Sequence, residues 1–149
     1  MSVEFGAATH DDLPQLVALL GVLFSQEAEF VPDDAKQTRA LKKILSDESV
    51  GRIHVAREGG KVVAMASLIY GISTAEGGLA AAFEDLIVLP GHRGKGVGTA
   101  LLQYVIAEAR KQGVLRLTLL TDKQNKRAQA LYRKLGFVES TMKAMRLKL

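Results

Sequence analysis

The sequence predicts an α/β (α+β) fold in which a mixed central sheet of about six or seven strands is flanked by four helices. Three observations carry this prediction. Strand-like and helix-like periodicity alternate in the order β-α-α-β-β-β-α-β-α-β. A glycine hairpin joins two early strands, which makes them antiparallel neighbours. Residues 79–121 read as strand, helix and strand, a crossover that implies a parallel pair.

The first part of the chain supplies one strand and two helices. Val3 to Ala7 is predicted as a short strand, and Asp11-Asp12-Leu13-Pro14 is typical of a helix start. The apolar positions of that helix recur at helical spacing: Leu13, Leu16, Val17, Leu20, Leu23 and Phe24. A second helix opens at Pro32-Asp33-Asp34. Its apolar side carries Leu41, Ile44 and Leu45.

The middle of the chain supplies three strands. Arg52 to Arg57 and Val62 to Tyr70 are predicted strands on either side of the Gly59-Gly60 turn. Ser73 to Gly78 is a predicted loop. Leu79 to Leu89 is a long apolar run, which we expect to form a strand buried on both faces.

The last third of the chain supplies two helices and the remaining strands. Gly96 to Gln112, the crossover helix, and Asn125 to Leu135 are predicted helices, each with a glycine after it that ends it. Leu115 to Thr121 is a predicted buried strand between them. Phe137 to Leu147 is expected to add a last strand or strand pair.

Length and composition limit the class of protein. We expect the 149 residues to form a single domain, 1–149, with a substantial core. No stretch of eighteen apolar residues and no basic-then-apolar start is present, so neither a membrane partner nor a secretory signal is expected. The absence of cysteine excludes disulfides, thiolate metal sites and a cysteine nucleophile. A cytoplasmic location is the default expectation.

Charge is distributed unevenly along the chain. Residues 1–90 hold 7 basic and 13 acidic residues, whereas residues 91–149 hold 13 basic and 3 acidic residues. Solvated helix faces are one interpretation. A small polyanionic ligand on the basic side, with a cationic substrate on the acidic side, is another. A nucleic-acid partner is not expected, because aromatic content is 5% and no nucleic-acid motif is present.

The most informative motif is a glycine turn between a strand and a helix. Gly94, Gly96 and Gly98 come after the apolar run, and the helix starts at once. Such a turn aims backbone N–H groups and a helix N-terminus at one point, which suits a phosphate. The sequence after Gly96 is not Lys-Ser or Lys-Thr, so a nucleotide-triphosphate P-loop does not fit. A dinucleotide fingerprint needs a third glycine where Thr99 stands.

Two further segments give the turn a family likeness. Arg93-Gly94-Lys95-Gly96-Val97-Gly98 resembles the [QR]-x-x-G-x-[GA] motif of the GNAT N-acetyltransferase superfamily. Residues 125–137, NKRAQALYRKLGF, resemble that family's N-x-x-A-x-x-L-Y-x-x-x-G-F segment. Together with residues 83–88, the likeness covers residues 83–137.

The resemblance implies acetyl-CoA as acyl donor. Its pantetheine would lie along the strand backbone, and its pyrophosphate on the N–H groups of the turn. Asn125 would contact it as well, although Asn also suits the N-cap of the helix that begins there. The positions implied for donor binding are Leu86, Ile87, Val88, Arg93, Gly94, Lys95, Gly96, Val97, Gly98, Thr99 and Asn125.

The resemblance also implies N-acetyltransferase chemistry by direct transfer in a ternary complex. Tyr132 would be the general acid that protonates the leaving thiolate, although it also lies on the helix face expected to pack in the core. Glu84 and Asp85 are candidates for the general base, and we take Glu84 as the catalytic one. Because successive strand residues face opposite ways, only one of the two is expected to enter the pocket. An N–H of Ile87 or Val88 would hold the carbonyl oxygen.

The acceptor is expected to be an amine, bound between the first two helices and the Ser73–Gly78 loop. Glu27, Phe30 and Tyr70 are the candidate substrate-binding residues, with charge attraction as the reason for Glu27. The three histidines show no metal-ligand spacing, so no metal is expected. Dimers are common in the family, so a homodimer is one expectation. An acyl-CoA-binding sensor or scaffold without catalysis is the alternative.

Overall fold

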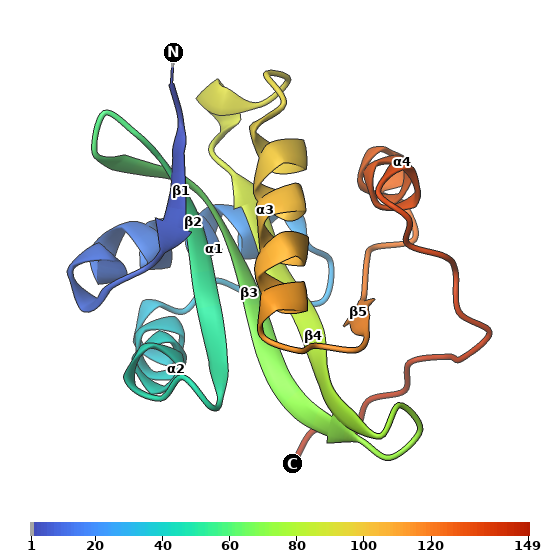
Figure 1. Cartoon of the computed structure of the whole chain (residues 1–149). Helices are drawn as coiled ribbons and strands as arrows, with labels where there is room; N and C mark the ends of the chain where they lie inside the picture. Colours follow the sequence, from blue (N-terminus) through green and yellow to red (C-terminus); the bar gives the residue numbers. More distant parts are fainter. Residues whose placement is uncertain (1) are drawn as a thin grey trace.

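The computed structural model describes residues 2–149 and contains one five-stranded sheet with helices on both faces (Figure 1). The strands lie in chain order across the sheet: β1 (Glu4–Ala7), β2 (Gly51–Glu58), β3 (Lys61–Ser73), β4 (Gly78–Val88) and β5 (Leu117–Leu119). The helices are α1 (Leu13–Gln26), α2 (Asp34–Ser46), α3 (Val97–Lys111) and α4 (Lys126–Lys134), with 3-10 turns at His10–Asp12 and Pro90–His92. Within residues 2–149, no helix has both the length and the apolar character needed to cross a membrane.

The sheet is mixed, as the element order predicts. Strands β1 to β4 form an antiparallel meander, whereas β4 and β5 are parallel and joined through α3. The hairpin between β2 and β3 turns at Gly59 and Gly60, both with positive φ. That conformation suits glycine, which has no Cβ to clash.

Two apolar layers hold the helices to the sheet. Helices α1 and α2 cover one face, where Leu16, Leu19 and Leu41 pack with buried side chains of β2 and β3. Helix α3 covers the other face, where Leu101, Leu102 and Val105 pack on β3 and β4. We call these the α1 face and the α3 face. Successive side chains along a strand point to the two faces in turn, so the cluster in which a residue packs shows the face to which it points.

Charged side chains stabilise the N-termini of the first two helices. The side chain of Asp33 accepts a hydrogen bond from the Lys36 N–H at 3.1 Å, which caps α2. Before α1, the two Asp12 carboxylate oxygens accept hydrogen bonds from the Arg57 guanidinium at 2.6 and 2.7 Å. The pKa of Asp12 is lowered, mainly by this contact. The pair ties the start of α1 to β2 across the sheet edge.

Replacing Asp12 with asparagine is expected to lower the free energy of unfolding by about 1.5–3 kcal/mol near neutral pH, because a charge-assisted pair is lost. A lowered folded pKa means that the stabilisation is present above the ordinary carboxyl pKa and is lost as pH falls through the folded value. Denaturant unfolding at neutral and acidic pH should therefore show the difference shrinking in acid. The control is Asp11→Asn, since Asp11 is exposed. An equal loss in both variants would contradict this role for Asp12.

The structure corrects the expected strand count. Five strands are present among residues 2–149 instead of six or seven. The strand expected at Leu115–Thr121 is only Leu117–Leu119, and no strand forms over Phe137–Leu147. A strand forms only where a segment lies along a partner edge, and this segment loops out from α4 without lying along β5, which has only three residues (Figure 1). Its apolar side chains, Val138, Met142, Met145 and Leu147, are exposed.

The expected start of the first helix is confirmed, since α1 begins at Leu13 with Asp12 as its N-cap, after a 3-10 turn at His10–Asp12. One smaller expectation is corrected. Strand β4 is not buried on both faces, because Glu84 is exposed in its middle. That exception lies where the sheet opens.

Candidate active site

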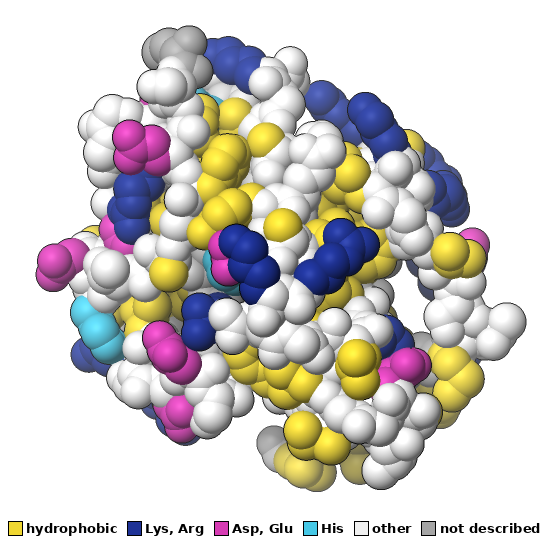
Figure 2. Space-filling view, viewed as in Figure 1, with side chains coloured by type: hydrophobic (Ala, Val, Ile, Leu, Met, Phe, Trp, Pro, Cys, Tyr) yellow, Lys and Arg dark blue, Asp and Glu magenta, His cyan; other side chains and the backbone are white. Residues whose placement is uncertain are grey.

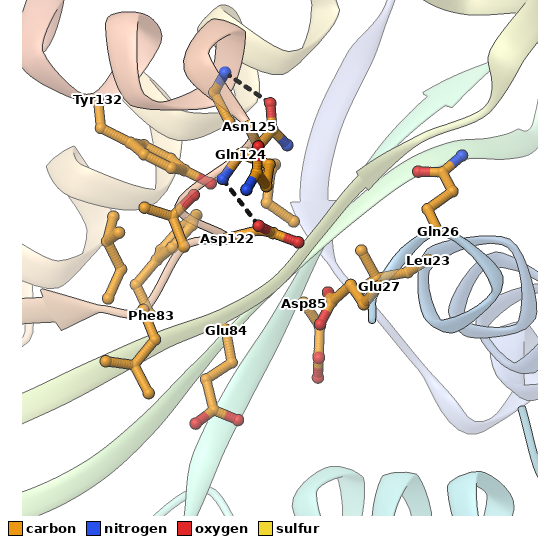
Figure 3. Close-up of a pocket in the computed structure, with 15 residues that line it drawn as sticks. Leu23, Gln26, Glu27, Phe83, Glu84, Asp85, Asp122, Gln124, Asn125 and Tyr132 are labelled. Atoms are coloured by element: carbon orange, nitrogen blue, oxygen red, sulfur yellow. Dashed lines mark hydrogen bonds between the residues drawn. The ribbon is translucent and has the colours of Figure 1, made fainter. Parts of the chain in front are cut away.

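The sheet opens between β4 and β5. The two strands pair only where Ala81–Phe83 lies beside Leu117–Leu119. Beyond Phe83, β4 continues to Val88 with only β3 as its partner among the described strands. The opening leads into a cavity of about 390 Å³ between β4, the chain after β5, α4 and the end of α1 (Figure 3).

Backbone groups of Val88 point to the open edge of β4. The Leu89 N–H donates to the Val63 carbonyl at 2.9 Å, so it points to β3. N–H directions alternate along a strand, which turns the Val88 N–H to the open edge. The carbonyl of Val88 lies there as well, since it accepts a hydrogen bond from Arg93 Nε at 2.9 Å. Of the two N–H groups expected to hold a carbonyl oxygen, that of Val88 therefore has the suitable direction.

A β-bulge interrupts β4 at the cavity. Met65 faces Ile87, and two residues later Ser67 faces Glu84, so β4 carries one extra residue. Asp85 has φ +56°, a left-handed conformation that aspartate tolerates better than most residues. Phe83 and Leu86 pack on the α3 face. Glu84 and Asp85, between them, both point toward the α1 face (Figure 3).

This bulge overturns the expectation that only one of the two carboxylates enters the pocket. Strict alternation would separate them, but the extra residue places consecutive side chains on one side of the strand. Both line the cavity. Because aspartate carries no turn signal inside an apolar run, the sequence alone did not reveal the bulge.

The environments of the two carboxylates differ. Asp85 is largely buried, and this burial, together with Glu84 and then Glu27, raises its pKa to about 7. Glu84 is exposed. A carboxyl with a pKa near 7 can gain and lose a proton under ordinary conditions, as a general base requires. Of the two candidates, Asp85 therefore has the raised pKa that suits a general base, and the assignment of the base stays a prediction.

Tyr132 comes to the cavity from α4. Its ring packs edge-on against Phe83 at 6.4 Å and Phe137 at 5.8 Å between centroids. Its side chain points into the cavity (Figure 3). Burial, and to a lesser extent Glu27, raises the pKa of the phenol, which keeps it protonated. Tyr132 therefore both packs in the core and lines the cavity.

Asn125 lies at the same opening as the N-cap of α4. Its side-chain oxygen accepts a hydrogen bond from the Ala128 N–H at 3.1 Å. The capping role is thus confirmed. Asn125 also lines the cavity, and its contact with a donor remains a prediction.

The glycine turn forms an open cradle at the start of α3. Gly94 has φ +75° and Gly96 has φ +82°, and a Cβ built on either meets no atom within 4 Å. A Cβ on Gly98 meets Val88 Cγ2 at 3.4 Å, so the helix start lies against the end of β4. The first-turn N–H groups of a helix have no intrahelical partner and attract anions. A separate group of Lys and Arg side chains lies on the surface around α4 (Figure 2).

The acceptor residues expected from sequence are only partly brought together. Glu27, at the end of α1, lines the cavity. Phe30 packs against Phe24 and under Arg146 outside the lining. Tyr70 lies on the α3 face, away from the cavity, and its buried hydroxyl has no hydrogen-bond partner in the part of the chain that the structure describes. The lining also includes Asp122 and Gln124, which sequence reasoning did not select because they lie in an irregular segment.

Comparison with known proteins places this geometry in a family. Residues 16–137 match the model of the Acetyltransferase (GNAT) family. An uncharacterized N-acetyltransferase of Bacillus subtilis, YhfO, is 30% identical over 126 residues, which is 83% of this chain and 85% of that protein. The chain belongs to the GNAT acetyltransferase family.

Two further comparisons bear on extent and fold. An uncharacterized N-acetyltransferase of Mycobacterium tuberculosis is 36% identical over 95 residues, or 64% of this chain, and the match spans 58% of its length. A predicted acetyltransferase from Clostridium acetobutylicum, solved with acetyl-CoA, has the same fold with a TM-score of 0.78. It is 19% identical, and the alignment covers 99% of this chain and 96% of that one.

Proposed function

We propose that this chain transfers an acetyl group from acetyl-CoA to a primary amine by direct attack in a ternary complex. The observation that carries the proposal is the opening between β4 and β5. It leads into a cavity that holds both the Asp85 carboxyl, whose pKa is raised to about 7, and the half-buried phenol of Tyr132. The anion cradle at the start of α3 follows the end of the same strand, β4. Family membership and a fold neighbour solved with acetyl-CoA support the donor.

The residues present suit this donor. The N–H groups from Arg93 to Thr99 would hold the pyrophosphate, because no Cβ of Gly94 or Gly96 occupies the cradle. The free edge of β4 from Leu86 to Val88 would hydrogen-bond the amides of pantetheine. The thioester supplies the acetyl group.

Asp85 and Tyr132 in the cavity, and the Val88 N–H at the open edge of β4, then have one task each. Asp85 accepts a proton from the acceptor ammonium, which leaves a neutral amine with a free electron pair. The Val88 N–H donates a hydrogen bond to the carbonyl oxygen as negative charge develops on it. The amine nitrogen forms the new bond to the carbonyl carbon, and the carbon–sulfur bond breaks. Tyr132 gives its proton to the departing thiolate, and the second proton that the nitrogen loses as the amide forms restores the Tyr132 phenol.

Two measurements test the proposal. The first is calorimetric titration of the protein with acetyl-CoA, and the second is mass spectrometry of amines incubated with the protein and acetyl-CoA together. We expect saturable binding of acetyl-CoA, with NAD and ATP as negative controls, and an acetylated amine as product. Binding without transfer to any amine would favour an acyl-CoA-binding module that does no catalysis. Binding of NAD in place of acetyl-CoA would overturn the assignment of the turn.

The cradle gives a separate prediction. Gly96→Val is expected to weaken acetyl-CoA binding by at least about tenfold, because a side chain enters the space of the phosphate and disturbs its hydrogen bonds. Gly60→Val is the matched control, since Gly60 also has a strongly positive φ and open surroundings but lies in the β2–β3 turn. Calorimetry of both folded variants measures the effect. Equal affinity in the two would mean that the turn does not hold the donor.

A further inference from the structure

Four carboxylates line the cavity, whereas Arg146, whose charge partly offsets the raised pKa of Glu27, lies outside the lining. The four are Glu27, Glu84, Asp85 and Asp122, and no lysine or arginine of residues 2–149 is part of the lining. This is notable in a chain with a formal net charge of +4. One carboxylate is enough to take a proton from the acceptor, so three acidic groups have no part in the chemistry proposed above.

These carboxylates lie close enough to affect one another. Glu27 and Asp85 lie side by side between α1 and β4, with Asp122 across the opening (Figure 3). Burial, and then the charges of Asp122 and Glu29, raises the pKa of Glu27. Arg146, which is near Glu27, pairs with Glu29 at 3.2 Å and stacks on Phe30. Among residues 2–149, neither Glu27 nor Asp85 forms an ion pair.

We propose that the acceptor is a slim aliphatic di- or polyamine, and that Glu27 and Asp122 bind a second ammonium group while the first faces Asp85. The inference rests on the acetyltransferase function proposed above. Opposite charge in a partly buried site is attractive at several ångströms, and it relieves repulsion among like charges. Glu27 and Asp122 would thus select the acceptor.

The size of the cavity argues for a small acceptor. Its volume of about 390 Å³ is near the lower end for ligand sites, and it also has to admit the thioester end of the donor. A flexible aliphatic chain with one ammonium at each end suits a cavity of this size, in which Asp122 lies across the opening from Glu27 and Asp85. A peptide backbone carrying the amine would need a groove beside the cavity instead.

The test compares amines that differ in the second charge. Wild-type protein is titrated with 1,4-diaminobutane, spermidine and n-butylamine in the presence of CoA, and KM is measured for each with acetyl-CoA. We expect KM and Kd for the two polyamines to be at least about tenfold lower than for butylamine. Glu27→Gln should raise the polyamine values about tenfold while changing those of butylamine less than about twofold. Glu48→Gln, a carboxylate loss far from the cavity, is the control.

The outcomes separate this inference from the proposed function. Equal affinity for diamine and monoamine in wild-type protein, or an equal effect of Glu27→Gln on both, would overturn the inference even if transfer occurs. Selective diamine binding that depends on Glu27, without transfer, would uphold the ligand class and overturn the acetyltransferase proposal. Transfer to an amine that has no second charge, with no binding of spermidine, would uphold the acetyltransferase proposal and overturn the ligand class.

Discussion

Asp85→Asn is expected to lower kcat/KM for amine acetylation by about 10²–10⁴-fold, the usual range for loss of a general base. The amide has similar shape but cannot accept a proton from the acceptor ammonium. The bulge that holds position 85 has backbone φ +56°, which asparagine also tolerates, so the fold is expected to persist. Initial rates with acetyl-CoA and a saturable amine measure the effect.

Glu84→Gln is the matched control for this variant. It removes the neighbouring charge on the same face but leaves the buried carboxylate in place. We expect a much smaller loss of rate. A large loss in Glu84→Gln with nearly normal rates in Asp85→Asn would assign the base to Glu84, as the sequence resemblance implies.

Tyr132→Phe is expected to lower kcat by about 10²-fold or more, because the variant has no proton to give to the departing thiolate. The ring remains packed against Phe83 and Phe137, so acetyl-CoA affinity should change far less than kcat. Stopped assays of CoA release and calorimetry of acetyl-CoA measure the two quantities separately.

The control for Tyr132 is Tyr104→Phe. Tyr104 lies on α3, where its ring stacks with Phe5 at 5.7 Å between centroids, remote from the cavity lining. Its hydroxyl should therefore be dispensable. Unchanged kcat in Tyr132→Phe would leave this residue with a packing role only.

Much of the fold could be predicted because its signals are local. The Gly59-Gly60 hairpin, the Asp33 and Asn125 caps, and the strand–turn–helix at Gly94–Gly98 each depend on residues close in sequence. The parallel crossover then results from connection rules. These elements position the cradle at the end of β4.

Two features could not be predicted, because they depend on partners distant in sequence. Whether residues 137–147 form a strand depends on the edge that β5 offers, and β5 has only three residues. The bulge at Asp85 depends on the register between β3 and β4. Alternation alone would have turned Asp85 away from Glu84.

The acceptor side was predicted least well, for the same reason. Glu27 reaches the cavity because α1 ends beside β4, whereas Tyr70 falls on the opposite face of the sheet. Asp122 enters the site through an irregular segment that carries no periodicity. Charge and position in the sequence do not indicate which of these residues reach the cavity.

The most direct test of the central claim, that the β4 bulge makes Asp85 the base of an acetyl transfer, is the pH dependence of kcat/KM in wild-type protein and Glu84→Gln. The pKa of about 7 predicts a rate that rises with pH through that value and then levels. Removing the like charge of Glu84 should move this inflection to lower pH, whereas titration of the amine itself is the same in both proteins. An inflection at the same pH in both, or a profile with none near neutrality, would contradict the claim.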